Sequence, residues 1–266
     1  MTTLSTHRSR FTRVPQRLTV RETLSLGPRL RRIRFHGEAL QDIVHAGPGA
    51  HLKLLLPVSG ANSTGDAQWP DGFRSVARAY SLRRVDFAEN LLDVDFVLHG
   101  DDGPGSRWAI RAAIGDIIGL AGVGGPPLSS AAADFHLLAG DLTALPAIAA
   151  VLETLPATAS GVALIEVTDA ADQLVLQHPP GVQLHWLHAR ASSPLTGAVR
   201  QIRWPAEARV FATIAGESAS VLAIRQYLLR ERGLSPASLY TVPYWCRGWS
   251  EEDYHDERHR CMDGNT

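Results

Sequence analysis

The stretch FHLLAGDLTALPAIAAVLETLP, residues 135–156, decides the fold of this chain. It starts as a short apolar strand, turns after Gly140, and continues with Ile148, Val151 and Leu155 at helical spacing. A strand that leads directly into an apolar helix is the repeating unit of parallel sheets covered by helices. We therefore expect the sheet of this part of the chain to be parallel.

The rest of the second half repeats this alternation. Further strands are expected at GVALIEV (161–167), VQLHWLH (182–188), ARVFATIAG (208–216) and ASLYTV (237–242). Helices are expected at SPLTGAVRQIRW (193–204) and SASVLAIRQYLLRERG (218–233), the latter ending at Gly233. Alternation of this kind predicts a doubly wound, Rossmann-like parallel sheet over residues 135–245.

The first half has a different pattern, of short strands separated by turn residues. Expected strands are a hairpin at LTVRETLSLGPRLRRIRFHG (18–37), then HLKLLLP (51–57), RAYSLRRV (78–85), LLDVDFVLHG (91–100) and GDIIGLAGV (115–123). This rhythm predicts an antiparallel β-barrel over residues 1–124. A linker of small residues over 125–134 follows, and a charged tail over 246–266 ends the chain.

Composition bounds the function. The chain has 266 residues, 45% of them hydrophobic and 20% charged, and a net charge of −1, so nothing attracts it globally to nucleic acid or to a membrane surface. We find no signal peptide and no stretch long enough to span a bilayer. Cys246 and Cys261 form neither a zinc-type spacing nor a disulfide framework, which fits a cytoplasmic protein.

RAYSLRR, residues 78–84, is the first stretch that can carry chemistry. A cofactor lying along this strand can be stacked by the Tyr80 ring and hydrogen-bonded by Ser81, while the arginines neutralise a pyrophosphate. A solvated strand with its arginines in water explains the same pattern. Both interpretations stay open for this stretch taken alone.

DFVLHGDDGPGSRWA, residues 95–109, adds a glycine-rich turn that leads from a strand into a helix. We expect Ser106 to open that helix and to cap it, with backbone N–H groups at this end suited to phosphate. Asp101 and Asp102 are expected to face solvent, because carboxylates pointing inward would repel a phosphate.

Two turns in the second half lie where ligands of doubly wound sheets bind, beyond the carboxyl ends of the strands. Gly140, Asp141 and Thr143 follow the first strand, and Gly216 and Glu217 follow a later one. No GxGxxG motif is present, and ordinary strand–helix turns explain both stretches equally well.

Taken together, these stretches resemble the siderophore-interacting proteins of the ferredoxin-reductase superfamily. RAYSLR fits the R-x-Y-[ST]-x-R signature of the superfamily's FAD domain. The wider set is HLKLLLP, RAYSLR, DFVLHGDDGPGSRWA, LLAGDLTALPAI, AGE and YWCRGWSEEDYH, and it covers nearly the whole chain in order. The resemblance implies a FAD-binding β-barrel domain (1–124) followed by an NAD(P)-binding Rossmann-like domain (135–245).

The resemblance also implies a site. The expected FAD contacts are Arg78, Tyr80, Ser81, Leu82, Arg83, Asp95, Val97, His99, Gly105 and Ser106, with Ser81 near the redox-active ring nitrogen and Trp245 at the flavin face. The expected nicotinamide-nucleotide contacts are Gly140, Asp141, Thr143, Ala144, Gly216 and Glu217. No side chain is expected to act as acid, base or nucleophile, because the chemistry belongs to FAD.

Lys53 is the only lysine among the 26 basic residues of the chain. On its own, it is best explained as a side chain that reaches from a leucine-rich strand into water. The resemblance changes this interpretation, because it implies that Lys53 and Arg247 receive an anionic ferric siderophore. The tail of residues 246–266 would then contribute to the substrate pocket.

The resemblance implies a flavin-dependent ferric-siderophore reductase that passes electrons from NAD(P)H, or from a ferredoxin, through FAD to Fe(III). Two alternatives remain: a general flavin oxidoreductase with a protein or quinone acceptor, and a ferric-siderophore binding protein without turnover. The siderophore class, the choice between NADPH and NADH and the oligomeric state are left open. We expect no metal site, since His255 and His259 lie in a charged tail, and we expect Cys246 to be inert.

Overall fold

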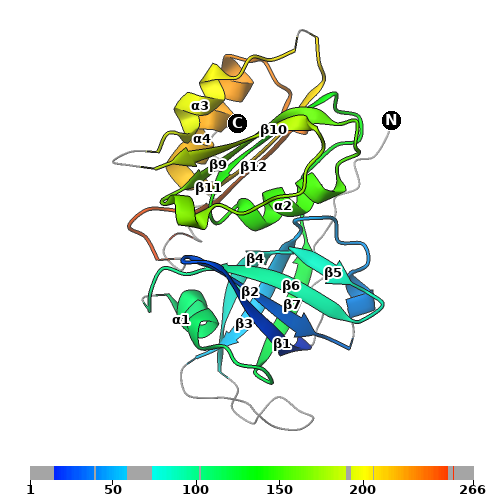
Figure 1. Cartoon of the computed structure of the whole chain (residues 1–266), viewed down its shortest axis with the longest axis vertical. Helices are drawn as coiled ribbons and strands as arrows, with labels where there is room; N and C mark the ends of the chain where they lie inside the picture. Colours follow the sequence, from blue (N-terminus) through cyan, green and yellow to red (C-terminus); the bar gives the residue numbers. More distant parts are fainter. Residues whose placement is uncertain are drawn as a thin grey trace. The chain divides into compact units, whose positions relative to one another are not determined.

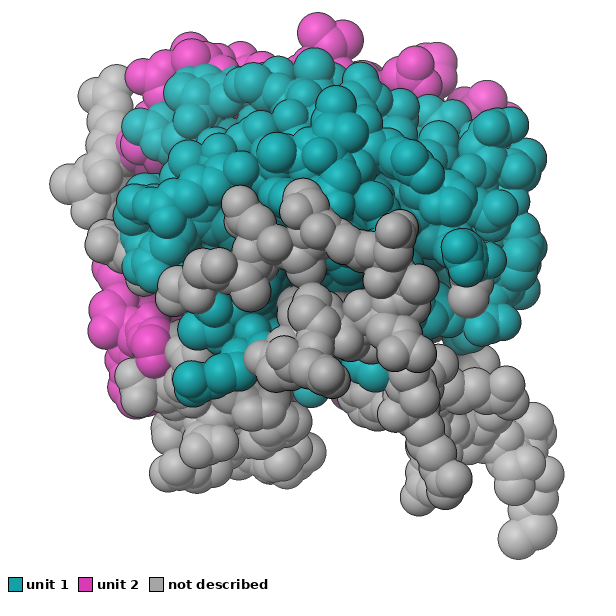
Figure 2. Space-filling model, turned by 90° about the horizontal axis from the view of Figure 1, so that it is seen from below, with its two compact units in different colours: residues 1–128, 149–154 teal, residues 129–148, 155–266 magenta. Residues whose placement is uncertain are grey.

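A computed structural model describes residues 15–38, 40–58, 74–101, 103–189, 193–205, 207–250 and Tyr254. The chain divides into two compact units (Figures 1 and 2). Unit 1 consists of residues 1–128 with 149–154, and unit 2 of residues 129–148 with 155–266. In the described part, no helix is both long enough and apolar enough to cross a membrane.

Unit 1 is built on a seven-stranded sheet in which all the pairs are antiparallel. Its strands are β1 (Gln16–Gly27), β2 (Leu30–His36), β3 (His51–Pro57), β4 (Ser75–Ser81), β5 (Arg84–Asp86), β6 (Leu91–Val97) and β7 (Ile117–Gly124). They lie in the order β4-β3-β7-β1-β2-β6-β5, accompanied by a short 3₁₀ helix η1 (Leu40–Ile43) and one α-helix, α1 (Pro104–Arg111). The predicted antiparallel, barrel-like first half is confirmed.

The core of unit 1 follows from strand alternation, because successive side chains point to opposite faces. On β3 the three residues Leu52, Leu54 and Leu56 are fully buried, while the residues between them are not. Phe96 of β6 packs with Trp108 of α1 at 5.5 Å between ring centroids, which fixes the helix against the sheet.

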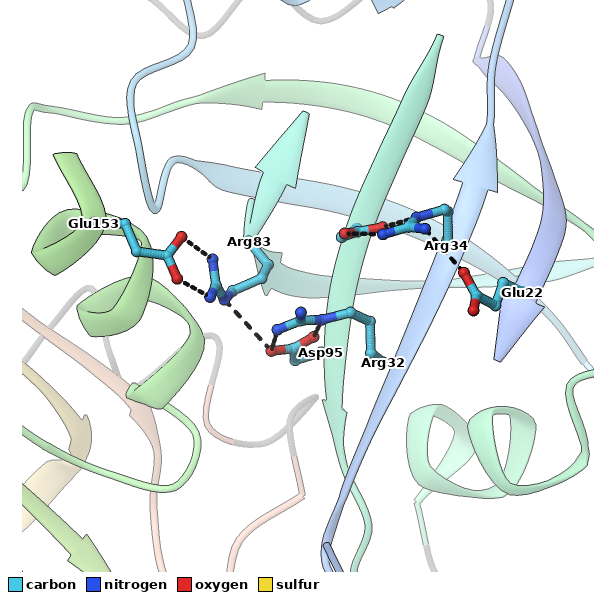
Figure 3. Close-up of polar contacts among 7 residues, drawn as sticks. Glu22, Arg32, Arg34, Arg83, Asp95 and Glu153 are labelled. Carbon is cyan, nitrogen blue, oxygen red and sulfur yellow. Dashed lines mark hydrogen bonds and ion pairs between the residues drawn. The ribbon is translucent and has the colours of Figure 1, made fainter. Parts of the chain in front are cut away.

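Strand β6 is buried on both faces, which its sequence pattern did not predict. Leu92, Val94 and Phe96 face the core, which agrees with the alternation of apolar and polar residues in LLDVDFVLHG, but Asp93 and Asp95 are also buried. The reason is a pair of arginines on the neighbouring strand β2, which cover these carboxylates (Figure 3). Buried charges require such partners.

Unit 2 is built on a five-stranded, all-parallel sheet in the order β10-β9-β8-β11-β12. Its strands are β8 (Phe135–Asp141), β9 (Ser160–Val167), β10 (Gly181–His188), β11 (Val210–Glu217) and β12 (Leu239–Trp245). Its helical segments are α2 (Leu145–Thr154, whose end belongs to unit 1), η2 (Ala170–Asp172), α3 (Leu195–Gln201), α4 (Ser218–Arg230) and η3 (Pro236–Ser238). The predicted doubly wound second half is confirmed.

The strand order places a topological switch point between β8 and β11, because the chain moves to one side of β8 and then to the other. Crevices at such points, beyond the carboxyl ends of the strands, are where doubly wound sheets bind their ligands. Asp141 ends β8, and Gly216 and Glu217 end β11. The sheet therefore brings these predicted site residues to the same edge.

The start of α1 differs from the prediction. The helix begins at Pro104, with Gly103 at its N-cap and no side-chain cap, so the expectation that Ser106 opens and caps it was wrong. The Ser106 hydroxyl instead accepts from the backbone N–H of His99 and donates to the carbonyl of Gly100. Proline favours the first helical position because its missing N–H is not needed there.

Candidate functional site

Tyr80 and the start of α1 come together on unit 1. The Tyr80 ring packs on Phe96 at 4.4 Å between centroids, and its hydroxyl lies beside Gly105. A Cβ at Gly105 would stand 2.1 Å from that hydroxyl oxygen, so only glycine permits the approach. The half-buried ring thus supports the glycine-rich turn, and its polar end lies at the first turn of the helix.

This first turn is suited to an anion. Among the described residues, Gly103 is the N-cap of α1 and gives no side-chain cap, and the N-terminal N–H groups of the helix carry the positive end of its dipole. The nearby carboxylate of Asp101 accepts from Arg111 at 2.8 Å, which offsets its charge. Asp101 is exposed, as expected, whereas Asp102 lies outside the described residues.

Arg83 is held by carboxylates. Its side chain is 9% exposed and donates two hydrogen bonds to Glu153 of α2, at 2.8 and 2.5 Å, while its Nε lies 3.8 Å from Asp95 (Figure 3). Such bidentate pairing is the strong form of an arginine–carboxylate contact. A phosphate at Arg83 would have to displace Glu153.

Asp95 faces arginines as well. Its side chain is 2% exposed and accepts from Arg32 at 2.6 and 2.8 Å. The hydrogen bond with Asp95 raises the pKa of Arg32, which keeps the guanidinium charged. On the same strand pair, Arg34 donates to Asp93 and, at 2.9 Å, to the exposed Glu22. This arginine–carboxylate ladder stabilises the barrel.

The other predicted flavin contacts vary in exposure. Ser81 and Leu82 are buried, Arg78 and Val97 are half-buried, and His99 is exposed. Of these five residues, only Arg78 and His99 have an ionisable side chain, and both residues are at least partly exposed to solvent.

Lys53 occupies an open position on β3. It is exposed, and its register partners are Ala79 of β4 and Gly122 of β7. His51, two residues before it on the same face, is also exposed and lies between Ser81 and Gly124. The register partners of these two basic residues on both neighbouring strands are all small.

Asp141 organises the edge of the parallel sheet in unit 2. One of its oxygens accepts from the backbone N–H of Thr143 at 2.8 Å and from the Thr143 hydroxyl at 2.5 Å. The other accepts from the backbone N–H of Glu217 and from the indole N–H of Trp245, both at 2.8 Å. The carboxylate thereby joins the ends of β8, β11 and β12.

The remaining predicted nucleotide contacts have structural neighbours of their own. Gly140 and Ala144 are buried, and a Cβ at Gly140 would stand 2.5 Å from that of Ala144. The Glu217 side chain caps α4 by accepting from the backbone N–H of Ser220 at 3.1 Å. Of this group, Thr143 and Glu217 are half-buried rather than buried.

Glu166 is a candidate that the sequence reasoning missed. It lies near the carboxyl end of β9, where burial raises the pKa of its carboxyl and the charge of Asp141 adds to the effect. Hydrogen bonds from the Ser193 hydroxyl and the Leu195 backbone, and the charge of Arg247, act in the opposite direction. The sequence feature that could have pointed to Glu166 is its position as the only acidic residue in the apolar stretch GVALIEV.

Among the described residues, no cluster of three or more His, Cys, Asp or Glu side chains could hold a metal ion. His255, His259 and Cys261 lie outside the described residues, so the tail is not tested. Cys246 is half-buried, directly after β12.

Two family models match the chain. A model described as a siderophore-interacting FAD-binding domain matches residues 19–127, which fall in unit 1. A model described as siderophore-interacting protein matches residues 133–248, most of which fall in unit 2.

Two relatives that are named reductases match over most of their length. Ferric vibriobactin reductase ViuB of Vibrio cholerae is 38% identical over 245 residues, which are 88% of this chain and 90% of the relative. NADPH-dependent ferric-chelate reductase of Escherichia coli is 30% identical over 237 residues, covering 86% and 91%.

Solved structures agree in fold. The siderophore-interacting protein SipS from Aeromonas hydrophila superimposes with a TM-score of 0.80 and 34% identity, covering 94% of this chain and 98% of that one. Ferredoxin-NADP+ reductase from Plasmodium falciparum, at 15% identity and a TM-score of 0.70, covers 89% and 99% and shows the shared fold. The chain belongs to the siderophore-interacting protein family, with a FAD-binding domain of the ferredoxin-reductase-like fold.

Proposed function

We propose that this protein is a FAD-dependent ferric-siderophore reductase, which takes electrons from NAD(P)H and passes them to siderophore-bound Fe(III). The observation that carries the proposal is the match, over 90% of its length, to a relative named ferric vibriobactin reductase. Three features support it because they lie on the unit that matches the FAD-binding domain: the N-terminal turn of α1, the Tyr80 hydroxyl and the exposed Lys53.

Unit 1 has hydrogen-bond donors and positively charged groups of the kind that FAD requires. The first-turn N–H groups of α1 suit a diphosphate, and the half-buried Arg78 can add positive charge. Tyr80, supported from behind by Phe96, offers an aromatic ring and a hydroxyl. When bound, FAD supplies the conversion of a two-electron hydride into the single electrons that Fe(III) accepts.

Arg83 and Asp95 have a different role in this proposal. Each is buried and paired with the opposite charge, so they hold the strands that present Tyr80 and Ser81 and do not contact phosphate. We therefore assign the direct phosphate contacts to Arg78 and to the first turn of α1, which contains Gly105 and Ser106.

Lys53 and Arg247 are the proposed substrate contacts. A ferric siderophore is bulky and often anionic, and a flexible ammonium above small neighbours can adapt to its outline. The side chains provide position and electrostatic field without moving protons at the iron. Siderophores bind Fe(II) much more weakly than Fe(III), so reduction releases the metal. We propose that this step takes place in the cytoplasm.

The nicotinamide nucleotide is proposed to bind at the switch point of unit 2, where Thr143, Gly216 and Glu217 meet. The Escherichia coli relative named an NADPH-dependent reductase supports a nicotinamide donor. A reduced ferredoxin is the other donor to be compared in the same assay.

The proposal is tested by steady-state reduction of a ferric tris-catecholate under anaerobic conditions, with a chelator that traps Fe(II). NADPH, NADH and reduced ferredoxin are compared as donors to the FAD-loaded protein. Lys53→Ala should raise the KM for the chelate by up to about fivefold and leave kcat nearly unchanged, as expected for loss of one exposed charge contact. Arg84→Ala, which removes an exposed charge from β5, is the matched control.

Lys53→Arg should retain most of the affinity, because it keeps the charge. An unchanged KM in Lys53→Ala would remove this residue from the substrate site. Absence of Fe(II) with all three donors would contradict the reductase assignment itself.

A further inference from the structure

The indole of Trp245 is tied to the edge of the parallel sheet by one hydrogen bond. Its N–H donates to Asp141 at 2.8 Å, although the two residues are 104 positions apart and Trp245 is 37% exposed. The ring therefore stands at the surface with its orientation fixed from one side. A side chain of this size at the surface would otherwise sample several rotamers.

Asp141 has no acceptor capacity left for a ligand. A carboxylate offers about four lone-pair positions, and four donors already use them: two from Thr143, one from Glu217 and one from Trp245. Its negative charge would also repel the phosphates of a nucleotide. Both features argue against direct contact between Asp141 and a dinucleotide.

The neighbouring glycine shows that this arrangement is built into the fold. Gly216 has φ of +124°, and a Cβ there would stand 2.6 Å from the Asp141 oxygen that receives Trp245. Only glycine allows β11 to pass this close to the carboxylate and turn into α4. The close approach also brings the Glu217 N–H to the same oxygen.

We propose that Asp141 is a positioning residue, which sets the orientation of the Trp245 ring and does not itself contact the nucleotide. The oriented ring then offers a fixed aromatic surface to the nicotinamide nucleotide proposed to bind on unit 2, and this last step rests on the proposed function. The contact between Asp141 and Trp245 is a property of the protein without any ligand.

The first test uses the wild-type protein without cofactor. Hydrogen exchange of the tryptophan indole N–H groups is followed by ¹H–¹⁵N NMR, with Trp245 assigned from Trp245→Phe. We expect the Trp245 indole N–H to exchange at least about tenfold more slowly than that of Trp249, a residue that is 51% exposed, because a hydrogen bond to a charged acceptor contributes at least that factor. Equal exchange rates would overturn the proposal.

The second test uses Asp141→Asn, which keeps the size of the side chain but replaces one acceptor by a donor. The asparagine has one oxygen, so it cannot accept all four hydrogen bonds that Thr143, Glu217 and Trp245 donate to the carboxylate. The indole N–H resonance of Trp245 should therefore shift, and its exchange rate should rise to that of Trp249. Thr143→Val is the matched control, because it removes only the hydroxyl bound to the other oxygen. An unshifted resonance in Asp141→Asn, or an equal shift in both variants, would overturn the proposal.

The functional test is a double-mutant cycle on the FAD-loaded protein, in which NADPH or NADH reduces the flavin. If Asp141 acts through the ring, Asp141→Asn should weaken the apparent nucleotide affinity in the wild-type background and have little further effect in Trp245→Phe. An equal effect in both backgrounds would mean direct contact and would refute the positioning role. If neither nucleotide reduces the flavin, the proposed function fails, and the indole measurements still decide the role of Asp141.

Discussion

Asp95→Asn is the substitution that separates a structural role from a cofactor-binding role on unit 1. It preserves the shape of the side chain but removes the negative charge that faces two guanidinium groups. Arg32 donates to Asp95 at 2.6 and 2.8 Å, and Arg83 lies 3.8 Å away. The amide can keep one hydrogen bond from Arg32, but its NH₂ group would point at a cation.

The expected cost follows from burial. Asp95 is 2% exposed in its side chain, Arg83 9% and Arg32 21%, so the charges left behind are poorly compensated by water. Removing one partner of a buried ion pair costs roughly 3–5 kcal/mol. Glu153 continues to neutralise Arg83, so we expect a value near the lower end, about 3 kcal/mol.

Glu22→Gln is the matched control on the same ladder. Glu22 is 55% exposed and its partner Arg34 35% exposed, so the loss should stay below about 1 kcal/mol. Urea unfolding of the protein without cofactor measures both variants, and hydrogen exchange of peptides from β2 and β6 shows whether the loss is local. An Asp95→Asn variant that unfolds within about 0.5 kcal/mol of wild type, while its FAD affinity falls, would refute the structural role.

Three further substitutions test single contacts. Gly105→Ala should push the Tyr80 hydroxyl aside and lower the FAD affinity measured by fluorescence titration, since a Cβ there lies 2.1 Å from the oxygen. Gly197→Ala in α3 should instead raise the free energy of unfolding by about 0.5–1 kcal/mol in urea titrations, because nothing lies within 4 Å of its Cβ position. Glu166→Gln should stabilise the protein at neutral pH. Burial raises the pKa of that carboxyl above its ordinary 4.5, so wild type gains stability as pH falls through the raised pKa, and the variant's advantage in urea midpoint should vanish below about pH 4.5.

The fold could be predicted because both halves have regular patterns of apolar residues. FHLLAGD followed by a helical run, repeated with strand–helix alternation, is enough to indicate a parallel sheet. The strand order, with its switch point between β8 and β11, was not predicted from the sequence and comes from the structure. The start of α1 was misplaced because Ser106 looks like a cap, while proline and glycine before it begin the helix.

The partners of charged residues could not be predicted, because they come from strands far apart in the sequence. Arg32 pairs with Asp95 across 63 residues, and Asp141 with Trp245 across 104. The family resemblance implied cofactor contacts for Arg83, Asp95 and Asp141, and the structure shows that each of them also has protein partners. Only the folded structure shows whether an arginine is available to bind a phosphate or already forms an ion pair with a carboxylate of the protein.

The most direct test of the proposed reductase is a single-turnover experiment without nucleotide. The FAD-loaded protein is reduced chemically under anaerobic conditions and mixed with a ferric tris-catecholate, and flavin reoxidation is followed alongside trapped Fe(II). We predict rapid reoxidation with two Fe(II) released per flavin, since FAD delivers two electrons one at a time to Fe(III). A flavin that stays reduced while the chelate is present would contradict the proposed reductase activity.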